Sequence, residues 1–201
     1  MKLKIWEMSL IVAIVITLLS GFVLDNSQNE LSGKLIRLHV LANSDSDEDQ
    51  ALKLTVRDSI LSEISDILIG AESKSEAVTI IEENIPALTK IAADKIEEEG
   101  YDYSVSMSIE NEDFPTRIYD TFSLPAGNYT SLRVEIGESE GQNWWCVVFP
   151  PLCVTAAEGE DSLETTELTD EEVSLITEEY TGYVIKFKAL EILDSIKAAV
   201  S

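Results

Sequence analysis

Hydrophobic and polar residues are arranged along the chain in patterns that predict its helices and strands. Apolar side chains occupy alternate positions in the segment 36–41, which indicates a strand. The polar residues 43–47 follow and supply side chains of the kind that cap helices. A helix is expected from there to Gly70, because its apolar residues recur every three or four positions: Leu52, Val56, Ile60, Ile64, Ile67 and Leu68.

A second helix is predicted after Ser73, since Ser73 and Glu76 have the spacing of a capping box. Its helical pattern continues to Gly100, and glycine commonly ends helices. Pro86 lies inside this pattern. Because proline removes one helix hydrogen bond, we expect a kink or a restart there.

Four extended segments come next, at 101–109, 117–122, 129–136 and 144–149. The first alternates strictly between apolar and polar residues, as a half-buried strand does. The last two flank the turn residues 137–141, which favours pairing as a hairpin. The order of strand, helices and antiparallel meander predicts an α+β fold with the helices on one face of the sheet.

The two ends of the chain differ from this middle region. Lys2 and Lys4 precede an uncharged run of 17 residues, 8–24, which is typical of a secretory signal peptide or a short single-pass anchor. Either segment would place the rest of the chain outside the cytoplasm. We therefore divide the chain into an export segment or anchor (1–30), an α+β core (31–157), an acidic linker (158–172) and a C-terminal strand and helix segment (173–201).

Composition narrows the possible chemistry. With 14 Lys and Arg against 38 Asp and Glu, the net charge is −24, which argues against binding nucleic acid. One histidine and two cysteines are too few for a common zinc site. His39 is the one candidate for a histidine-based triad and is more typical of a hydrogen-bonded structural residue. The sequence therefore predicts no catalytic residue, no cofactor and no metal.

The acidic residues 45–49 resemble the start of a calcium-binding loop. An EF-hand needs glycine at its sixth position and glutamate at its twelfth, where this chain has Gln50 and Val56. Carboxylates also favour the first turn of a helix, and that capping role explains these residues.

Cys146 and Cys153 are the two cysteines, and in an exported domain such a pair is commonly oxidised. A bridge between them would close a loop of eight residues, worth about 2.5 kcal/mol by the loop-entropy relation. The rigid Pro150-Pro151 pair between them could also keep the thiols apart, so buried reduced thiols and pairing between molecules stay open.

A candidate partner-binding surface lies next to these cysteines. Successive residues of a strand point to opposite faces of a sheet, so Trp144 and Trp145 cannot share one core. An exposed tryptophan beside a rigid corner is typical of an interaction hot spot, unless the last helices cover that face. The candidate contact residues are Arg133, Trp144, Trp145, Phe149, Pro150 and Pro151.

Two blocks of this chain resemble the stage II sporulation protein R family of endospore-forming bacteria, and the resemblance covers roughly residues 36–154. The first block is the run 36–46, continued by Asp49-Gln50, Leu52-Lys53 and Val56-Arg57-Asp58. The second block is Pro125-Ala126-Gly127-Asn128-Tyr129, then Leu132-Arg133-Val134 and Gly137, then the run 143–153.

This resemblance implies a developmental signal rather than a catalyst. Proteins of the family are made in the forespore and exported into the space between the two membranes. There they trigger a membrane-embedded aspartic protease of the mother cell, which cleaves a pro-sigma factor. The expected partner is therefore that protease, with contact to a membrane only if the segment 8–24 is not cleaved.

A rival hypothesis from a different class is an exported cell-wall hydrolase. In that case carboxylates such as Asp45, Asp47 and Asp120 would do general acid–base work. A hydrolase should lose activity on single carboxylate substitutions, whereas a binding surface should tolerate most of them.

Overall fold

The computed structural model describes residues 4, 10–11, 31–119 and 122–152. The predicted acidic linker (158–172), the predicted C-terminal segment (173–201) and nearly all of the predicted export segment or anchor (1–30) lie outside the described residues. No helix within the described part of the chain is long and apolar enough to cross a membrane.

The core contains two long helices and six strands within the described residues. The elements in chain order are β1 (Ile36–Leu41), α2 (Asp47–Ile67), α3 (Lys74–Glu98), β2 (Val105–Phe114), β3 (Arg117–Ile118), β4 (Ser123–Leu124), β5 (Gly127–Ile136) and β6 (Asn143–Phe149). The predicted α+β class is confirmed.

Both helices begin at the predicted caps and end two or three residues before the predicted glycines, Gly100 and Gly70. The Ser46 side chain accepts a hydrogen bond from the Asp49 amide, and Ser73 accepts one from the Glu76 amide. Helix α3 continues through Pro86 as one helix, so the alternative of a restart there is wrong. Pro86 is exposed, and solvent can satisfy the carbonyl group that loses its donor.

The main sheet has the strand order β2-β5-β1-β6. Strand β1 pairs in parallel with β5 and antiparallel with β6, while β2 pairs antiparallel with β5. The expected hairpin between 129–136 and 144–149 is therefore wrong, because β1 lies between these two strands. The segment 117–122 also does not join the main sheet, since β3 pairs with β4 in a separate two-stranded sheet.

The connection from β5 to β6 crosses the end of β1. Its backbone is held there by hydrogen bonds from the Glu140 amide to the Asn43 carbonyl and from the Gly141 amide to the Ala42 carbonyl. A Cβ atom at Gly141 would overlap the backbone of Ser44. The glycine thus allows two backbone segments to approach each other, which a short hairpin turn would not require.

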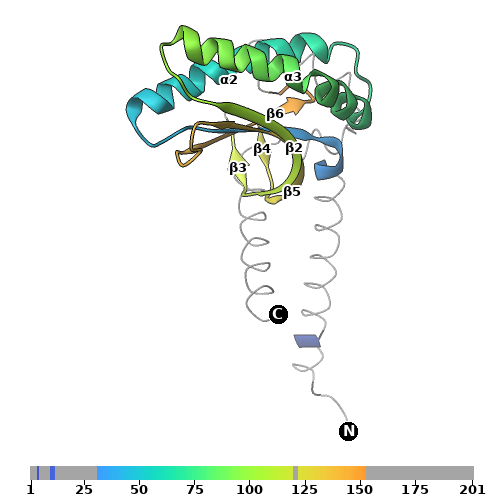
Figure 1. Ribbon diagram of the computed structural model, residues 1–201. Helices are drawn as coiled ribbons and strands as arrows, with labels where there is room; N and C mark the ends of the chain where they lie inside the picture. Colours follow the sequence, from blue (N-terminus) through green and yellow to red (C-terminus); the bar gives the residue numbers. More distant parts are fainter. Residues whose placement is uncertain (1–3, 5–9, 12–30, 120–121, 153–201) are drawn as a thin grey trace.

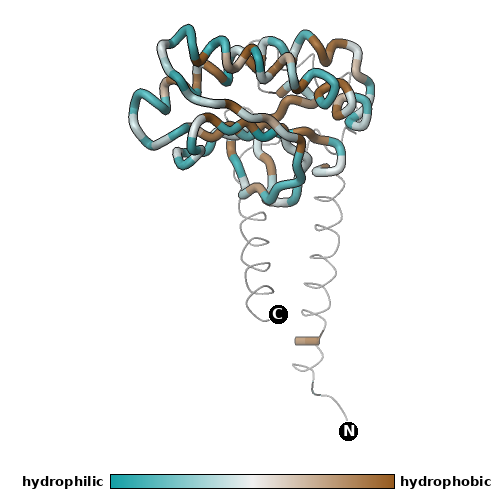
Figure 2. Tube along the Cα trace, in the orientation of Figure 1, coloured by the Kyte–Doolittle hydropathy of each residue, from teal (hydrophilic) through white to brown (hydrophobic). Residues whose placement is uncertain are grey.

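The molecule has three layers, with α2 and α3 on one face of the main sheet and the β3–β4 pair on the other (Figure 1). A large apolar core lies between the helices and the sheet and includes Leu38, Val40, Val56, Ile60 and Val134. A smaller core lies on the opposite face and includes Leu31, Leu35, Phe114, Tyr129 and Val147. Figure 2 shows hydrophobic positions in the helices and central strands, and hydrophilic connecting loops.

Candidate partner-binding site

The two tryptophans at the start of β6 belong to different faces of the sheet, as their alternation predicts. Trp144 packs against the core under the helices, and the Arg57 guanidinium carbon lies 4.6 Å from the centre of its ring. Trp145 packs against the smaller core on the opposite face. Both are partly buried, so each indole presents part of its surface to solvent.

A polar network crosses the sheet on the Trp145 face. His39 lies between Arg133 of β5 and Trp145 of β6 in the strand register. Its Nδ1 is 2.7 Å from Glu112 Oε2, and its Nε2 is 2.7 Å from Asn143 Oδ1. Both ring nitrogens of His39 therefore have partners, which agrees with a structural role for this residue.

Arg133 is held within the same network. Its Nε donates to Glu135 Oε1 at 2.9 Å, and its Nη1 donates to Glu112 Oε2 at 3.3 Å. Burial alone would lower the pKa of Arg133, but the carboxylates of Glu135 and Glu112 raise it above its ordinary value. The side chain is thus ion-paired inside the protein and only partly exposed.

Arg37, also on this face, is fully buried and lacks a carboxylate partner among the described residues. Its Nη2 donates to the hydroxyl of Tyr119 at 2.8 Å, whereas its Nε and Nη1 have no hydrogen-bond partner. The guanidinium carbon lies 4.1 Å from the ring centre of Phe114 and 5.1 Å from that of Tyr129. Burial lowers the pKa of Arg37, although the two tyrosines partly oppose this effect.

A second arginine lies nearer the surface. The guanidinium carbon of Arg117 is 3.8 Å from the centre of the Trp145 ring, which is a close cation–π contact. Arg117 and Trp145 line a cavity of about 450 Å³ together with Tyr119, Asn143 and Trp144. The candidate site is therefore this cavity, between the β3–β4 pair and the start of β6.

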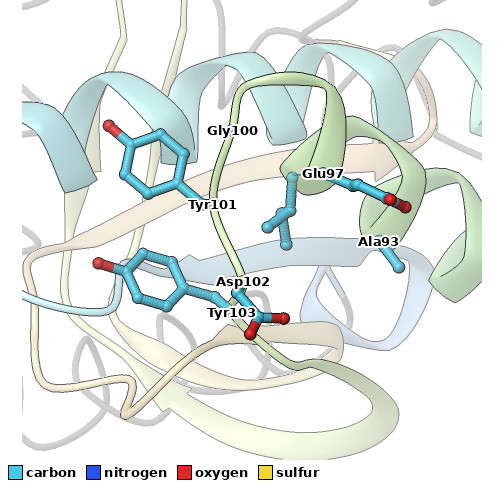
Figure 3. A pocket seen from close by; sticks show the side chains of 7 residues that line it. Ala93, Glu97, Gly100, Tyr101, Asp102 and Tyr103 are labelled. Atoms are coloured by element: carbon cyan, nitrogen blue, oxygen red, sulfur yellow. The ribbon is translucent and has the colours of Figure 1, made fainter.

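Another hollow, of about 570 Å³, lies where α3 leads into β2 (Figure 3). The Tyr101 and Tyr103 rings lie side by side there, with centres 5.4 Å apart, and Glu97 comes from the end of α3. Burial raises the pKa of Tyr103, and the nearby carboxylate of Asp49 in α2 raises it further.

Comparison with known proteins places this chain within a family. The family model for stage II sporulation protein R matches residues 32–159, more than half of the chain. The chain belongs to the stage II sporulation protein R family. A curated relative, stage II sporulation protein R of Bacillus subtilis (strain 168), is 35% identical over 170 residues, which are 83% of this chain and 76% of the relative. No solved structure matches the chain.

The residues expected to bind a partner are only partly brought together. Trp145 and Arg133 lie on one face, Trp144 lies on the other, and Pro151 is partly buried after β6. Phe149 and Pro150 are buried, so neither offers a side chain to a partner. Cys146 is 2% exposed, and Cys153 lies outside the described residues, so their pairing stays a prediction.

The structure describes two of the three carboxylates considered for the alternative, an exported cell-wall hydrolase. Asp45 is exposed in the turn before α2, and Asp47 is exposed in the first turn of that helix. Asp120 lies outside the described residues. Across the described ranges, no three His, Cys, Asp or Glu side chains are grouped so as to hold a metal ion.

The sequence analysis missed Arg37, Glu112, Arg117 and Tyr119, which complete the site. Arg37 could have been identified from the sequence, because it is a charged residue within a segment whose pattern predicts a strand. Nothing in the sequence indicates that Arg117 and Tyr119 lie near Trp145, because they belong to a short segment that pairs locally outside the main sheet.

Proposed function

We propose that this protein is an exported sporulation signal that activates a membrane-embedded aspartic protease of the mother cell, which then cleaves a pro-sigma factor. The observation that carries the proposal is membership of the stage II sporulation protein R family over the whole described core. The route is export from the forespore into the intermembrane space by means of residues 8–24, as a cleaved signal or as an anchor.

The protein would act as a ligand and not as a catalyst. A ligand activates its target by binding the active state more tightly than the inactive one, and a shift from 1% to 99% active requires about 5.5 kcal/mol of such preference. The contact surface would be the start of β6, where Trp144 and Trp145 line one cavity. Aromatic side chains that are partly exposed beside a cavity are the usual anchors of an interface.

The polar groups nearby support binding over catalysis. His39 has both ring nitrogens engaged, and Glu112 Oε2 contacts both His39 and Arg133. A general base must have a free lone pair directed at the substrate, and these groups are directed at one another instead.

The test is co-expression of the protein, the protease and the pro-sigma factor in a bacterium that does not sporulate, with pro-sigma cleavage followed on a gel. Cleavage is expected only when the protein is present and carries residues 1–24. If cleavage is equally efficient without the protein, the proposal fails and the exported hydrolase becomes the leading hypothesis.

Variants locate the contact surface in the same assay. Trp144→Ala and Trp145→Ala are each expected to reduce cleavage at least about tenfold, as loss of a hot-spot side chain does. Ile69→Ala is the matched control, because Ile69 is a large apolar side chain that is 79% exposed at the end of α2. Full activity of folded Trp144 and Trp145 variants would contradict this surface, and circular dichroism would establish that they are folded.

A further inference from the structure

Arg117 is a cation that has no carboxylate partner among the described residues of a strongly acidic protein. The chain carries a net charge of −24, and Arg133 and Arg57 of the core both pair with carboxylates. Within the described residues no carboxylate lies within ion-pair distance of Arg117, and its buried Nε has no hydrogen-bond partner. No acidic side chain of the described residues therefore neutralises the positive charge of Arg117.

Behind the same cavity, Arg37 adds a second positive charge that has no carboxylate partner in the part of the chain that the structure describes. Two of its nitrogens lack partners, and Tyr119 links it to the cavity wall by accepting from Arg37 and donating to the Trp145 carbonyl oxygen at 3.2 Å. Arg37 and Arg117 also repel each other electrostatically. Arg117 in the cavity wall, with the positive charge of the buried Arg37 behind it, creates a region that attracts an anion.

The chemistry of the cavity wall favours a carboxylate on a peptide. The Arg117 guanidinium lies over the Trp145 ring in the cavity wall, where it can offer paired N–H donors to a planar carboxylate. The indoles of Trp144 and Trp145 and the Asn143 side chain provide apolar and polar contacts for the neighbouring peptide.

We propose that the cavity between β3 and the start of β6 binds an aspartate or glutamate side chain of the partner protein, with Arg117 as the residue that contacts the carboxylate. This inference rests on the proposed function for the identity of the partner. Arg37 is a positioning residue here, because it acts through Tyr119 and through its charge. The indoles of Trp144 and Trp145 beside Arg117 suit the neighbouring side chains of a peptide, so the anion is assigned to a peptide.

Direct binding tests the site without the protease. The full chain in a nonionic detergent is titrated with the capped peptide acetyl-Gly-Glu-Glu-Gly-amide while tryptophan emission is recorded. The peptide in which both glutamates are glutamine is the matched ligand. Binding of the glutamate peptide is expected to change the emission, to weaken as salt is added, and to be at least about tenfold tighter than binding of the glutamine peptide.

Variants assign the binding to Arg117. Arg117→Gln is expected to weaken binding at least about tenfold, whereas Lys90→Gln, which removes the same charge from an exposed position on α3, should have no effect. Arg117→Lys keeps the charge but loses the paired donors, so it should recover only part of the affinity. It also keeps the assay informative if Arg117→Gln does not fold.

The outcomes separate the two proposals. Equal binding of the two peptides, unchanged binding by Arg117→Gln, or no response of the wild type at millimolar peptide would each overturn the carboxylate site. Binding to phosphatidylglycerol vesicles that Arg117→Gln abolishes would overturn the assignment to a peptide. None of these results depends on pro-sigma cleavage. The carboxylate site can therefore be wrong while the signalling function is right, and the signalling function can be wrong while the carboxylate site is right.

Discussion

At the scale of single residues, the two polar side chains of β1 occupy equivalent positions in an alternating pattern but differ in their hydrogen bonding. Arg37 and His39 alternate with apolar residues, and such alternation is typical of a strand with one face in solvent. Both are in fact buried, because the β3–β4 pair and neighbouring residues cover that face. His39 is satisfied by Glu112 and Asn143, whereas Arg37 keeps unpartnered nitrogens.

Asp49 offers a residue-scale prediction about pH. It is 5% exposed and accepts hydrogen bonds from the Ser44 hydroxyl and the Asn43 amide, which hold the pKa of its carboxyl below its ordinary value. Asp49→Asn is expected to lower the free energy of unfolding by about 1–2 kcal/mol at pH 7, because charge-assisted hydrogen bonds are lost. Urea unfolding at pH 7, 5 and 3 measures the difference.

The sign of the pH effect follows from the lowered pKa. The Asp49 carboxylate stabilises the fold above its ordinary pKa, and this contribution is lost as the pH falls through the lower pKa of the folded state. The gap between wild type and Asp49→Asn should therefore narrow below about pH 4. Asp66→Asn, at an exposed position of α2, should show no such gap, and a gap that widens in acid would contradict the prediction.

At the scale of elements, the sequence predicted what local patterns determine and missed what pairing determines. The ends of α2 and α3 depend on Ser46, Ser73 and nearby glycines, so they could be predicted from short windows. The order of strands depends on contacts between distant segments. A six-residue strand buried along its whole length, as β1 is, needs neighbours on both edges, and its position between β5 and β6 has no local signature.

The loop that crosses β1 gives an element-scale prediction. Gly141→Ala is expected to lower the free energy of unfolding by about 1–3 kcal/mol, because the added methyl group would overlap the Ser44 backbone, which cannot move as a side chain can. Thermal unfolding of the two proteins compares their stabilities.

Gly33→Ala is the matched control for this loop. A Cβ atom at Gly33 meets nothing within 4 Å, so the substitution should be neutral or slightly stabilising. If Gly141→Ala is as stable as wild type, the close crossing over β1 is wrong, and a simple hairpin between β5 and β6 would be favoured.

At the scale of the whole molecule, the sheet separates a structural face from a face that carries the candidate site. The helices cover one side with a continuous apolar core. The other side has a smaller core, the His39 network and the Arg117 cavity. Alternation along one strand places Trp144 and Trp145 on opposite faces of the sheet, so the sequence alone predicted a tryptophan on this face. The sequence did not predict that Arg37 and Arg117 belong to this site. They come near Trp145 only because the fold brings β1 and β3 beside β6.

The last prediction joins export to stability through Cys146 and Cys153. Cys146 is buried in β6, in the strand that carries both tryptophans, so a link to Cys153 would hold the end of this strand to the chain that follows. In the oxidising space outside the cytoplasm we expect one intramolecular disulfide, which mass spectrometry without reduction would detect as a mass 2 Da lower.

Cys153→Ser should lower the free energy of unfolding by about 2.5 kcal/mol in the exported protein and much less in a form without residues 1–24, which stays reduced. Alkylation of both cysteines in the unfolded, unreduced exported protein would contradict the disulfide, and an equal loss of stability in both forms would assign the effect to packing of the Cys153 side chain instead.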